Sequence, residues 1–393
     1  MTTDKLYTDR RFLVLGLSSF LFFVSFNMIV PELPAYLTSL GGEDYKGMII
    51  GLFAISAGLA RPFSGKLTDT IGRLPVLFIG CLVCVVLGFL YPLVSSVIGF
   101  LLLRFLHGFS TGFKPTADVA YVADIVPANK RGEAMGIMGI TNNLGMSVGP
   151  ALGSEVAASY GIHTLFYISA IVALLAVVVL FKLPETLKDK QKFTLKHLAV
   201  KKEDLFEPSV KLPALIMLLT VFSFGTMLTL VPDYAVHLGL QKQGYFFMAL
   251  TLTSLLVRLF SGKLSDRKGR RYVMMWGVFF LILAMITMAL AKSLLVLFIT
   301  AALLGISTGF NSPTLFAWAI DLSDDKFKGR GMATLYIALE AGIAIGAFAS
   351  AAIYNNKAAN FFWAFNTGAA LAVVAFVVLW LNYRNTKPQF SRQ

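Results

Sequence analysis

The stretch RPFSGKLTDTIGRLPV at residues 61–76 returns as RLFSGKLSDRKGRRYV at residues 258–273. Both copies place Gly, Lys, Asp, Gly and Arg at the same positions, and the offset of 197 residues is half of the 393-residue chain. Each copy lies between long apolar runs in which charged residues are scarce. The repeat therefore predicts two related halves, each with the same charged segment between two apolar ones.

The composition places the chain in a bilayer. Hydrophobic residues make up 57% and charged residues only 14%, with a mean hydropathy of +0.74, whereas soluble domains hold about 25% charged residues. A hydrocarbon core about 30 Å thick needs helical spans of about 20 residues, and no alternating barrel strands are evident. We expect an all-α polytopic membrane protein with twelve spans, near 12–36, 46–66, 74–95, 97–122, 133–157, 162–183, 213–238, 244–264, 272–291, 294–319, 330–353 and 360–382.

The distribution of basic residues predicts the topology. A net charge of +13 could suggest a nucleic-acid partner, but the charges follow the loops in the positive-inside pattern. We therefore expect no nucleic acid, both termini in the cytoplasm, a first span that is not cleaved, and a plasma membrane of the bacterial inner-membrane type. The inward basic residues are Lys5, Arg10, Arg11, Lys66, Arg73, Lys130, Arg131, those of 182–211, 263–271 and 326–330, Arg384, Lys387 and Arg392; the outward ones are Lys46, Lys242, Lys292 and Lys357.

The repeat holds its register well beyond the charged stretch. GFSTGF at 108–113 matches GISTGF at 305–310, and Asp124, Gly145 and Gly149 match residues 197 positions later. We predict a six-helix bundle over 1–184, a cytoplasmic linker over 185–211 and a second six-helix bundle over 212–393, related by a pseudo-two-fold axis. The mixed charge of the linker leaves two alternatives open, an interfacial helix or a flexible strap.

These features resemble the major facilitator superfamily. The resemblance rests on six plus six spans, the charged stretch in each half, Arg104 in the fourth span and LPET at 183–186. It implies a secondary active transporter whose halves rock about a cavity between the spans 12–36, 97–122, 213–238 and 294–319. A receptor that transports nothing remains an alternative. An intramembrane enzyme is disfavoured, because four His and two Cys offer no catalytic cluster, and we expect no cofactor.

By the resemblance, the repeated stretch is a conformational latch that holds the halves together at the cytoplasmic side. Its glycines permit close helix packing, and its Asp and Arg lie four residues apart. The first copy has Thr70 and Leu74 where the family has basic residues, so its latch is expected to be weaker. The alternative is that these loops only obey the positive-inside rule. The latch residues are Gly65, Asp69, Gly72 and Arg73, with Gly262, Asp266, Gly269 and Arg270.

A second motif indicates the direction of transport. Gly145, Gly149, Pro150 and Gly153 form a close-packing face on one helix, which the proline bends. This face resembles the hinge motif of antiporters in the superfamily, with Ser154 in place of its last glycine, and it favours export. The alternative is a packing role alone, since Gly and Pro are common in transmembrane helices.

Charges inside spans are costly and usually functional or paired. Glu340 lies near the bilayer centre and is the first candidate for proton coupling, followed by His107, Asp118 and Arg104. Glu340 could instead pair with a basic side chain and brace the halves, and Arg104 could be structural. Asp118 could be neutralised by Lys114. Arg61 and Arg258 are expected to snorkel to the cytoplasmic edge.

The predicted function is proton-coupled export of a small amphipathic or drug-like molecule by a monomer in the lipid bilayer, because Phe, Met and Leu dominate the cavity helices. The alternative is proton-coupled uptake of a small anionic metabolite or a siderophore-like compound, which Lys114 would favour if it faced the cavity. Cys81 and Cys84 are expected to be small hydrophobes rather than metal ligands. The cavity candidates are Asn27, Glu32, Lys114, Asn142, Asn143 and Asn311.

Overall fold

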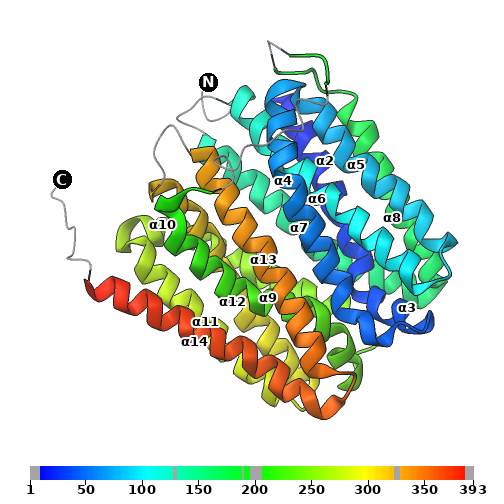
Figure 1. Ribbon diagram of the computed structural model, residues 1–393, viewed down its shortest axis with the longest axis vertical. Coiled ribbons are helices and arrows are strands. Elements are labelled where there is room, and N and C mark those ends of the chain that lie inside the picture. The colour runs from blue at the N-terminus through cyan, green and yellow to red at the C-terminus, as the bar shows by residue number, and fades with distance from the viewer. Residues whose placement is uncertain (1–8, 127–130, 188–189, 195–205, 323–327, 386–393) are drawn as a thin grey trace.

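The computed structural model describes residues 9–126, 131–187, 190–194, 206–322 and 328–385 (Figure 1). Helices are the regular structure throughout these residues, as predicted. Their bounds are α2 (Arg10–Ile29), the short turn η1 (Val30–Glu32) with α3 (Leu33–Ser39), α4 (Lys46–Thr70), α5 (Arg73–Leu90), α6 (Val97–Ile125), α7 (Arg131–Tyr160), α8 (Ile162–Leu180), α9 (Lys211–His237), α10 (Gly244–Lys268), α11 (Arg270–Leu290), α12 (Leu294–Leu322), α13 (Lys328–Tyr354) and α14 (Phe361–Asn385).

Ten of the described helical segments are long and apolar enough to cross a membrane. The segments that fall short are α6 and α7, although both are long. Arg104, His107 and Lys114 lower the hydropathy of α6, but all three side chains are buried in the protein. In α7 the cause is its many Gly, Asn and Ser residues. The side chains that lower the hydropathy of α6 therefore face the protein rather than lipid.

Several helices are longer than their predicted spans. α4 runs to Thr70 and α10 to Lys268, beyond the predicted ends at 66 and 264. The apolar stretch of each helix ends at its first charged residues, whereas the helix itself continues to the residue at which the backbone turns. Gly72 and Gly269 have φ values of 130° and 90°, a conformation in which glycine carries no steric cost. These two glycines separate α4 from α5 and α10 from α11.

The two halves repeat the same close contacts between helices. A Cβ on Gly112 of α6 would lie 2.8 Å from the Ala57 carbonyl oxygen of α4. A Cβ on Gly309 of α12 would lie 2.9 Å from the carbonyl oxygen of Ser254 on α10, and these two residues are 197 positions after Gly112 and Ala57. Small residues let helix backbones approach closely in a membrane. The repeated sequence therefore produces a repeated packing geometry.

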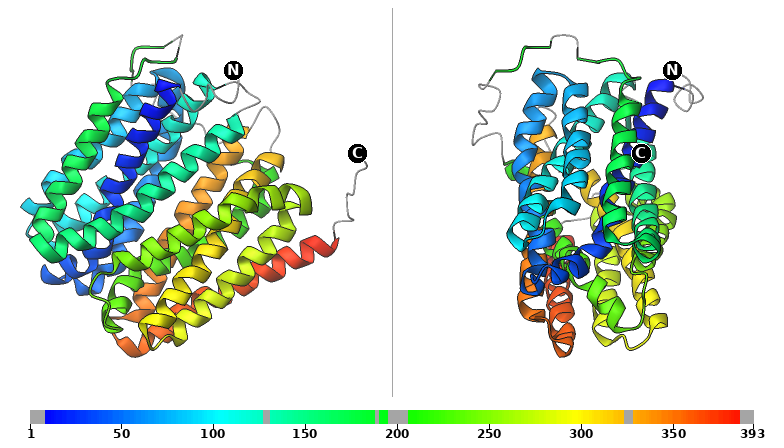
Figure 2. Two further views of the ribbon diagram at one scale, coloured as in Figure 1. Left: turned by 180° about the vertical axis from the view of Figure 1, so that it is seen from behind. Right: turned by 90° about the vertical axis from the view of Figure 1, so that its right-hand side faces the viewer.

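The helices form two groups (Figures 1 and 2). In the first, α4 and α5 pack on α6, and α2 packs on α7 and α8; in the second, α10 and α11 pack on α12, and α9 packs on α13 and α14. One large apolar cluster lies wholly within 210–379 and another wholly within 12–183. The main contacts between the groups are α4 with α13 and α7 with α10.

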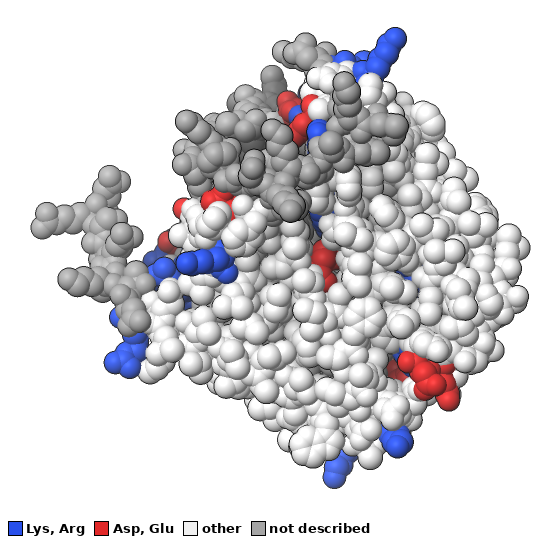
Figure 3. Space-filling view, in the orientation of Figure 1, with Lys and Arg blue, Asp and Glu red and all other residues white. Residues whose placement is uncertain are grey.

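Charged side chains gather at the two ends of the helices, and most of the surface between them in one view is uncharged (Figure 3). We call the end at which α2 begins and α14 ends the terminal end, and the other the opposite end. Among the basic residues assigned to one side by sequence, Lys5, Lys130, Lys387 and Arg392 lie outside the described residues, as do 188–189 and 195–205 of the linker and 326–327 of the 326–330 segment. The two alternatives for the linker, an interfacial helix or a flexible strap, therefore concern a segment that lies partly outside the described residues.

We predict that Gly112→Ala and Gly309→Ala each lower the free energy of unfolding by about 1–3 kcal/mol, the usual effect of overpacking. The added methyl group meets backbone atoms, which move less easily than a side chain. Gly65→Ala is the matched control, because a Cβ there has no other heavy atom within 4 Å. Thermal unfolding in detergent micelles measures all three, and equal midpoints for all would contradict the close packing.

Candidate transport cavity

A cavity of about 450 Å³ lies between the two groups of helices. Its walls come mainly from α2, α4, α6 and α7 in the first half and α9, α10, α12 and α13 in the second, with Val30 of η1 and Leu281 of α11. The prediction named α2, α6, α9 and α12 only, but α4, α7, α10 and α13 also line it because they meet at the contact between halves. Most of the lining is apolar and aromatic, including Phe23, Phe26, Phe53, Phe224 and Phe247.

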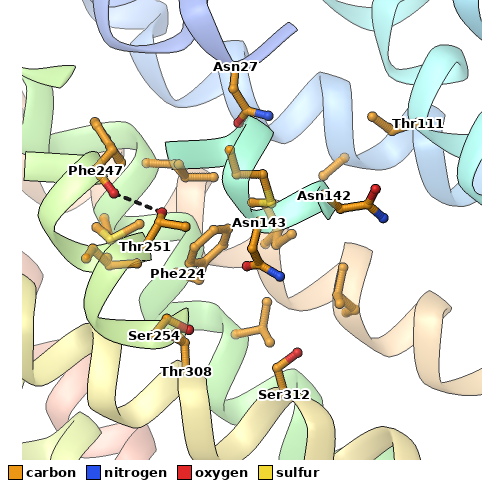
Figure 4. A pocket seen from close by; sticks show the side chains of 18 of the residues that line it. Asn27, Thr111, Asn142, Asn143, Phe224, Phe247, Thr251, Ser254, Thr308 and Ser312 are labelled. Carbon is orange, nitrogen blue, oxygen red and sulfur yellow. Dashed lines mark hydrogen bonds between the residues drawn. The ribbon is translucent and has the colours of Figure 1, made fainter. Parts of the chain in front are cut away.

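Four of the predicted polar residues line this cavity: Asn27, Asn142, Asn143 and Asn311. The first three are labelled in Figure 4. Asn27 Nδ2 donates to the Phe23 carbonyl oxygen at 2.8 Å, and Asn143 Nδ2 donates to that of Gly139 at 2.6 Å. Each of these amide nitrogens has a second hydrogen that can serve a ligand. The Oδ1 atoms of Asn142 and Asn311 have no hydrogen-bond partner among the described residues.

Glu340 is joined to Arg61 across the two halves. Arg61 Nη2 lies 3.1 Å from Glu340 Oε1, and both side chains are about nine-tenths buried. Arg61 also donates through Nη1 to Thr116 Oγ1 at 3.4 Å, and its guanidinium lies 4.2 Å from the centre of the Tyr336 ring. The prediction that Arg61 snorkels to the membrane edge is therefore wrong, because a carboxylate within the cavity holds it.

Arg104 lines the same cavity, and its bonds go to the protein. Its Nε donates to the Ile49 carbonyl oxygen at 3.1 Å and its Nη1 to Tyr91 Oη at 3.4 Å. The guanidinium also lies 4.7 Å from the centre of the Phe53 ring. A backbone carbonyl, a hydroxyl and an aromatic face satisfy a buried arginine without a carboxylate. Arg104 therefore joins α6 to α4 and to Tyr91, which directly follows α5.

Lys114 and Asp118 lie away from the cavity. Lys114 Nζ is 2.9 Å from Asp118 Oδ1 and 2.9 Å from Ser19 Oγ, and its side chain is fully buried. Ser19 Oγ donates in turn to Asp118 Oδ2 at 2.9 Å. The expectation that Lys114 could receive anionic cargo is not met, because α6 turns it towards α2 and towards Gly80 of α5.

His107 and Glu32 are also placed elsewhere. His107 Nδ1 lies 3.2 Å from Tyr91 Oη and Nε2 lies 3.3 Å from Cys84 Sγ, so the ring is enclosed between α5 and α6. Cys81 and Cys84 are free buried thiols. Glu32 accepts a hydrogen bond from Ser154 Oγ at 2.7 Å, near the opposite end of α7. None of these side chains is part of the described cavity wall.

The charged residues of the predicted latch form two matching networks at the terminal end. The close packing predicted for Gly65 and Gly262 is wrong, because a Cβ on either glycine would meet no neighbouring helix within 4 Å in the described part of the chain. Arg73 lies 3.1 Å from Asp69 Oδ1 and 3.0 Å from Asp124 Oδ2. In the second half, Arg270 Nε lies 2.8 Å from Asp321 Oδ2, and Asp266 is its other partner. Each network stays within its own half, and the carboxylates of Asp69 and Asp266 are 73% and 65% exposed.

Glu185 of the LPET motif completes the first network, a role the sequence did not indicate. Its carboxylate accepts hydrogen bonds from the backbone nitrogens of Arg73 and Leu74, both at 3.0 Å. A carboxylate at a helix N-terminus satisfies free N–H groups and the helix dipole. Gly72 leaves room for it, since a Cβ there would collide with Glu185. The motif therefore caps α5 and joins it to the chain after α8.

Polar contacts join the two halves at the opposite end. Lys46 of α4 pairs with Asp233 of α9 at 2.5 Å, and Lys242 pairs with Glu155 of α7 at 2.8 Å. The hydrogen bond with Glu155 raises the pKa of Lys242, so this lysine stays charged at neutral pH. The Gly244 backbone nitrogen also donates to Ser154 Oγ at 3.0 Å. These contacts link the two halves at the opposite end.

The glycine face of α7 packs against α2. A Cβ on Gly145 would lie 2.8 Å from the Phe20 carbonyl oxygen, and one on Gly149 would lie 2.7 Å from that of Val24. A Cβ on Gly153 would lie closer still to the carbonyl oxygen of Met28. In the second half, Gly342 and Gly346 of α13 meet the backbone of α9 at Leu218 and Phe222. Close packing therefore occurs in both halves, whereas Pro150 occurs only in the first, where its carbonyl faces Gly244 of α10.

Comparisons with known proteins agree on one family. The sequence model of the Major Facilitator Superfamily matches residues 15–294 and 214–393. The multidrug resistance protein MdtG of Escherichia coli O1:K1 is 28% identical over 97% of both chains. An uncharacterised MFS-type transporter of Methanocaldococcus jannaschii is 26% identical over 86% of this chain and 90% of its own.

Solved structures share the fold. The human organic anion transporter MFSD10 superposes with a TM-score of 0.74 at 21% identity, covering 94% of this chain and 99% of its own. The nucleoside transporter NupG superposes with a TM-score of 0.75 at 15% identity, covering 95% of this chain and 99% of its own. At these identities the likeness concerns the arrangement of the helices.

The Arg61–Glu340 pair generates a stability prediction. Arg61→Gln should lower the free energy of unfolding by about 3–5 kcal/mol, because it leaves a buried carboxylate without its partner. The double variant Arg61→Gln, Glu340→Gln should recover part of this loss. Arg258→Gln is the matched control at the repeated position, since no acidic partner is recorded for it among the described side chains. Equal losses in Arg61→Gln and Arg258→Gln would show that the pair contributes nothing specific.

Proposed function

The chain belongs to the major facilitator superfamily and is a multi-pass membrane transporter, and we propose that it exports a small amphipathic molecule in exchange for protons. The observation that carries this proposal is the buried Arg61–Glu340 pair, which lies in the wall of the cavity and joins the two halves. A titratable carboxylate at that place can link a proton to the relative position of the halves. The chemistry of the cavity suggests the cargo.

The proposed topology has twelve membrane-spanning helices in two six-helix bundles, 1–184 and 212–393, joined by the linker 185–211. A pseudo-two-fold axis relates the bundles, and both termini lie in the cytoplasm of a bacterial-type inner membrane. The repeated glycine contacts and the repeated Asp–Arg–Asp networks support this symmetry. α6 can span because its charged side chains face the protein interior, where intramembrane charges are tolerated.

The proposed mechanism is alternating access. In this conformation the halves are joined at the opposite end by Lys46–Asp233 and Lys242–Glu155. At the terminal end each charged network stays within its own half, with Asp69 and Asp266 exposed. This arrangement fits a state whose cavity is reached from the cytoplasm. In the other state, the exposed Asp69 and Asp266 would engage the facing half as latches.

Glu340 is the proposed coupling site. Its neighbours are the guanidinium of Arg61, with Thr116 and Tyr336 on the other sides of that guanidinium. Transfer of a proton from water to the Glu340 carboxylate removes its charge, which weakens its bond to Arg61 and frees α4 to move relative to α13. Loss of the proton restores the ion pair. Pro150 and the glycine face of α7 would supply the hinge for this motion.

The proposed cargo class follows from the aromatic walls of the cavity and from the relative named for multidrug resistance. A pocket of about 450 Å³ is within the range that holds drug-sized ligands. Phe side chains from both halves present large apolar surfaces, and the Asn, Ser and Thr side chains between them can bind the polar part of a ligand. Such a wall suits several related amphipathic molecules.

We predict that Glu340→Gln abolishes pH-driven transport and retains substrate binding, because glutamine keeps the shape and hydrogen bonding of the side chain but cannot titrate. Purified protein in liposomes, with only a pH difference across the membrane, measures accumulation of a fluorescent amphipathic dye. Glu43→Gln, at an exposed residue of the opposite end, is the control. Accumulation by Glu340→Gln at the wild-type level would exclude Glu340 as the coupling site.

For the latch, Asp69→Asn should shift the resting population further towards the state open at the terminal end and reduce transport several-fold without loss of expression. The substitution removes the charge that the closed terminal end would need. Reaction of cysteines introduced into the cavity wall with a membrane-impermeant thiol reagent from the terminal side measures the shift. Unchanged reactivity together with full transport would remove the latch from the mechanism.

A further inference from the structure

We propose that the cargo of this cavity is an amphipathic organic anion whose carboxylate, sulfonate or phosphate group is held by Arg258 of α10 and Asn143 of α7. This inference rests on the proposed transport function and narrows its substrate class. It replaces Lys114, which is buried with Asp118, as the source of positive charge for an anionic ligand.

The proposal begins with a difference between the two halves. Arg61 and Arg258 occupy the same position of the repeat, 197 residues apart, and so do Asn143 and Glu340. α4 packs against α13 at one side of the contact between halves, and α10 packs against α7 at the other. The first side therefore pairs Arg61 with a carboxylate. At the equivalent place on the second side, the residue that corresponds to that carboxylate is the neutral Asn143.

Arg258 is consequently a positively charged residue of the cavity wall that has no carboxylate partner among the described side chains. Its recorded hydrogen bond runs from Nε to Ser254 Oγ at 3.4 Å, and no ion pair of Arg258 is found among the described side chains. Both Arg258 and Asn143 line the cavity. The charged residues of the wall are Arg61, Arg104, Arg258 and Glu340, so Glu340 offsets only one of three guanidinium groups.

A half-buried guanidinium gains most from a partner that accepts two parallel hydrogen bonds, and carboxylate, sulfonate and phosphate groups do so. Asn143 can add a further donor, because only one of its amide hydrogens is used by the Gly139 carbonyl oxygen. Ser254 and Thr308 share a hydrogen bond of 3.1 Å beside Arg258. The anionic group of the ligand would thus give Arg258 the negatively charged partner that Glu340 gives Arg61.

The rest of the ligand must be apolar. Phe224 of α9 and Phe247 of α10 line the cavity, and Figure 4 shows Phe224 beside Asn143, with Ser254 and Thr308 below them in that view. An aromatic or aliphatic body would pack on these rings while its charged group reaches Arg258. A small hydrophilic anion would leave these rings exposed to water and bind poorly.

The test compares naphthalene-2-sulfonate, a permanent anion, with the neutral naphthalene-2-sulfonamide in liposomes that contain the full chain. We expect the wild type to transport the sulfonate, and Arg258→Gln to reduce that transport at least tenfold while sulfonamide transport changes little. Arg267→Gln, at an exposed arginine in the last turn of α10, should behave as wild type. Arg258→Lys should retain part of the sulfonate transport, because the charge remains.

A second variant tests the missing carboxylate directly. Asn143→Glu should pair with Arg258 as Glu340 pairs with Arg61, and so block the sulfonate while sparing the sulfonamide; Asn143→Gln is its control. Wild-type sulfonate transport by Arg258→Gln, or by Asn143→Glu, would overturn the proposal. Transport of the sulfonamide but not the sulfonate by the wild type would also overturn it, yet leave the proposed function intact. Absence of any pH-dependent transport would instead remove the proposed function.

Discussion

A charge buried inside a bilayer protein needs a partner, and this constraint organises the structure. Lys114 with Asp118 and Ser19 satisfies it within the first half, and Arg104 does so through a carbonyl oxygen, a hydroxyl and an aromatic ring. Arg61 satisfies it with Glu340, a residue of the other half. The stability of the buried Arg61 charge therefore depends on the relative position of the two halves. A change of charge at Glu340 affects the contact between them.

Among the described residues, ion pairs join the two halves at one end of the molecule only, and the Arg61–Glu340 pair joins them in the cavity wall. Lys46–Asp233 and Lys242–Glu155 join the halves at the opposite end, while the Arg73 and Arg270 networks remain within their own halves. Arg61–Glu340 lies in the cavity wall. Under the proposed mechanism, a proton at Glu340 would act in the wall of the proposed cargo cavity, and the repeat-related Arg258 would remain to bind the cargo.

Much of the fold could be predicted from sequence, because hydropathy and a repeat in register are local properties of the chain. The glycines at 72 and 269 mark turns in both sequence and structure. The partners of buried charges could not be predicted in the same way.

Arg61 and Glu340 are 279 residues apart and meet only because α4 packs on α13. Lys114 has a helical neighbour four residues away in Asp118, and its orientation away from the cavity depends on Ser19 of another helix. Repeat alignment was the available signal, because it equates Arg61 with Arg258 and Glu340 with Asn143.

Pulsed electron-electron distance measurements in nanodiscs test the central claim, that the charge of Glu340 sets which end of the molecule is joined. One spin-label pair, on exposed Lys182 and Arg384, reports the terminal end, and another, on exposed Ser95 and Lys292, reports the opposite end. The account predicts that lowering the pH redistributes the two distances in opposite senses, and that Glu340→Gln fixes one distribution at every pH. Distances that respond to pH equally in wild type and Glu340→Gln, or that change together at both ends, would contradict it.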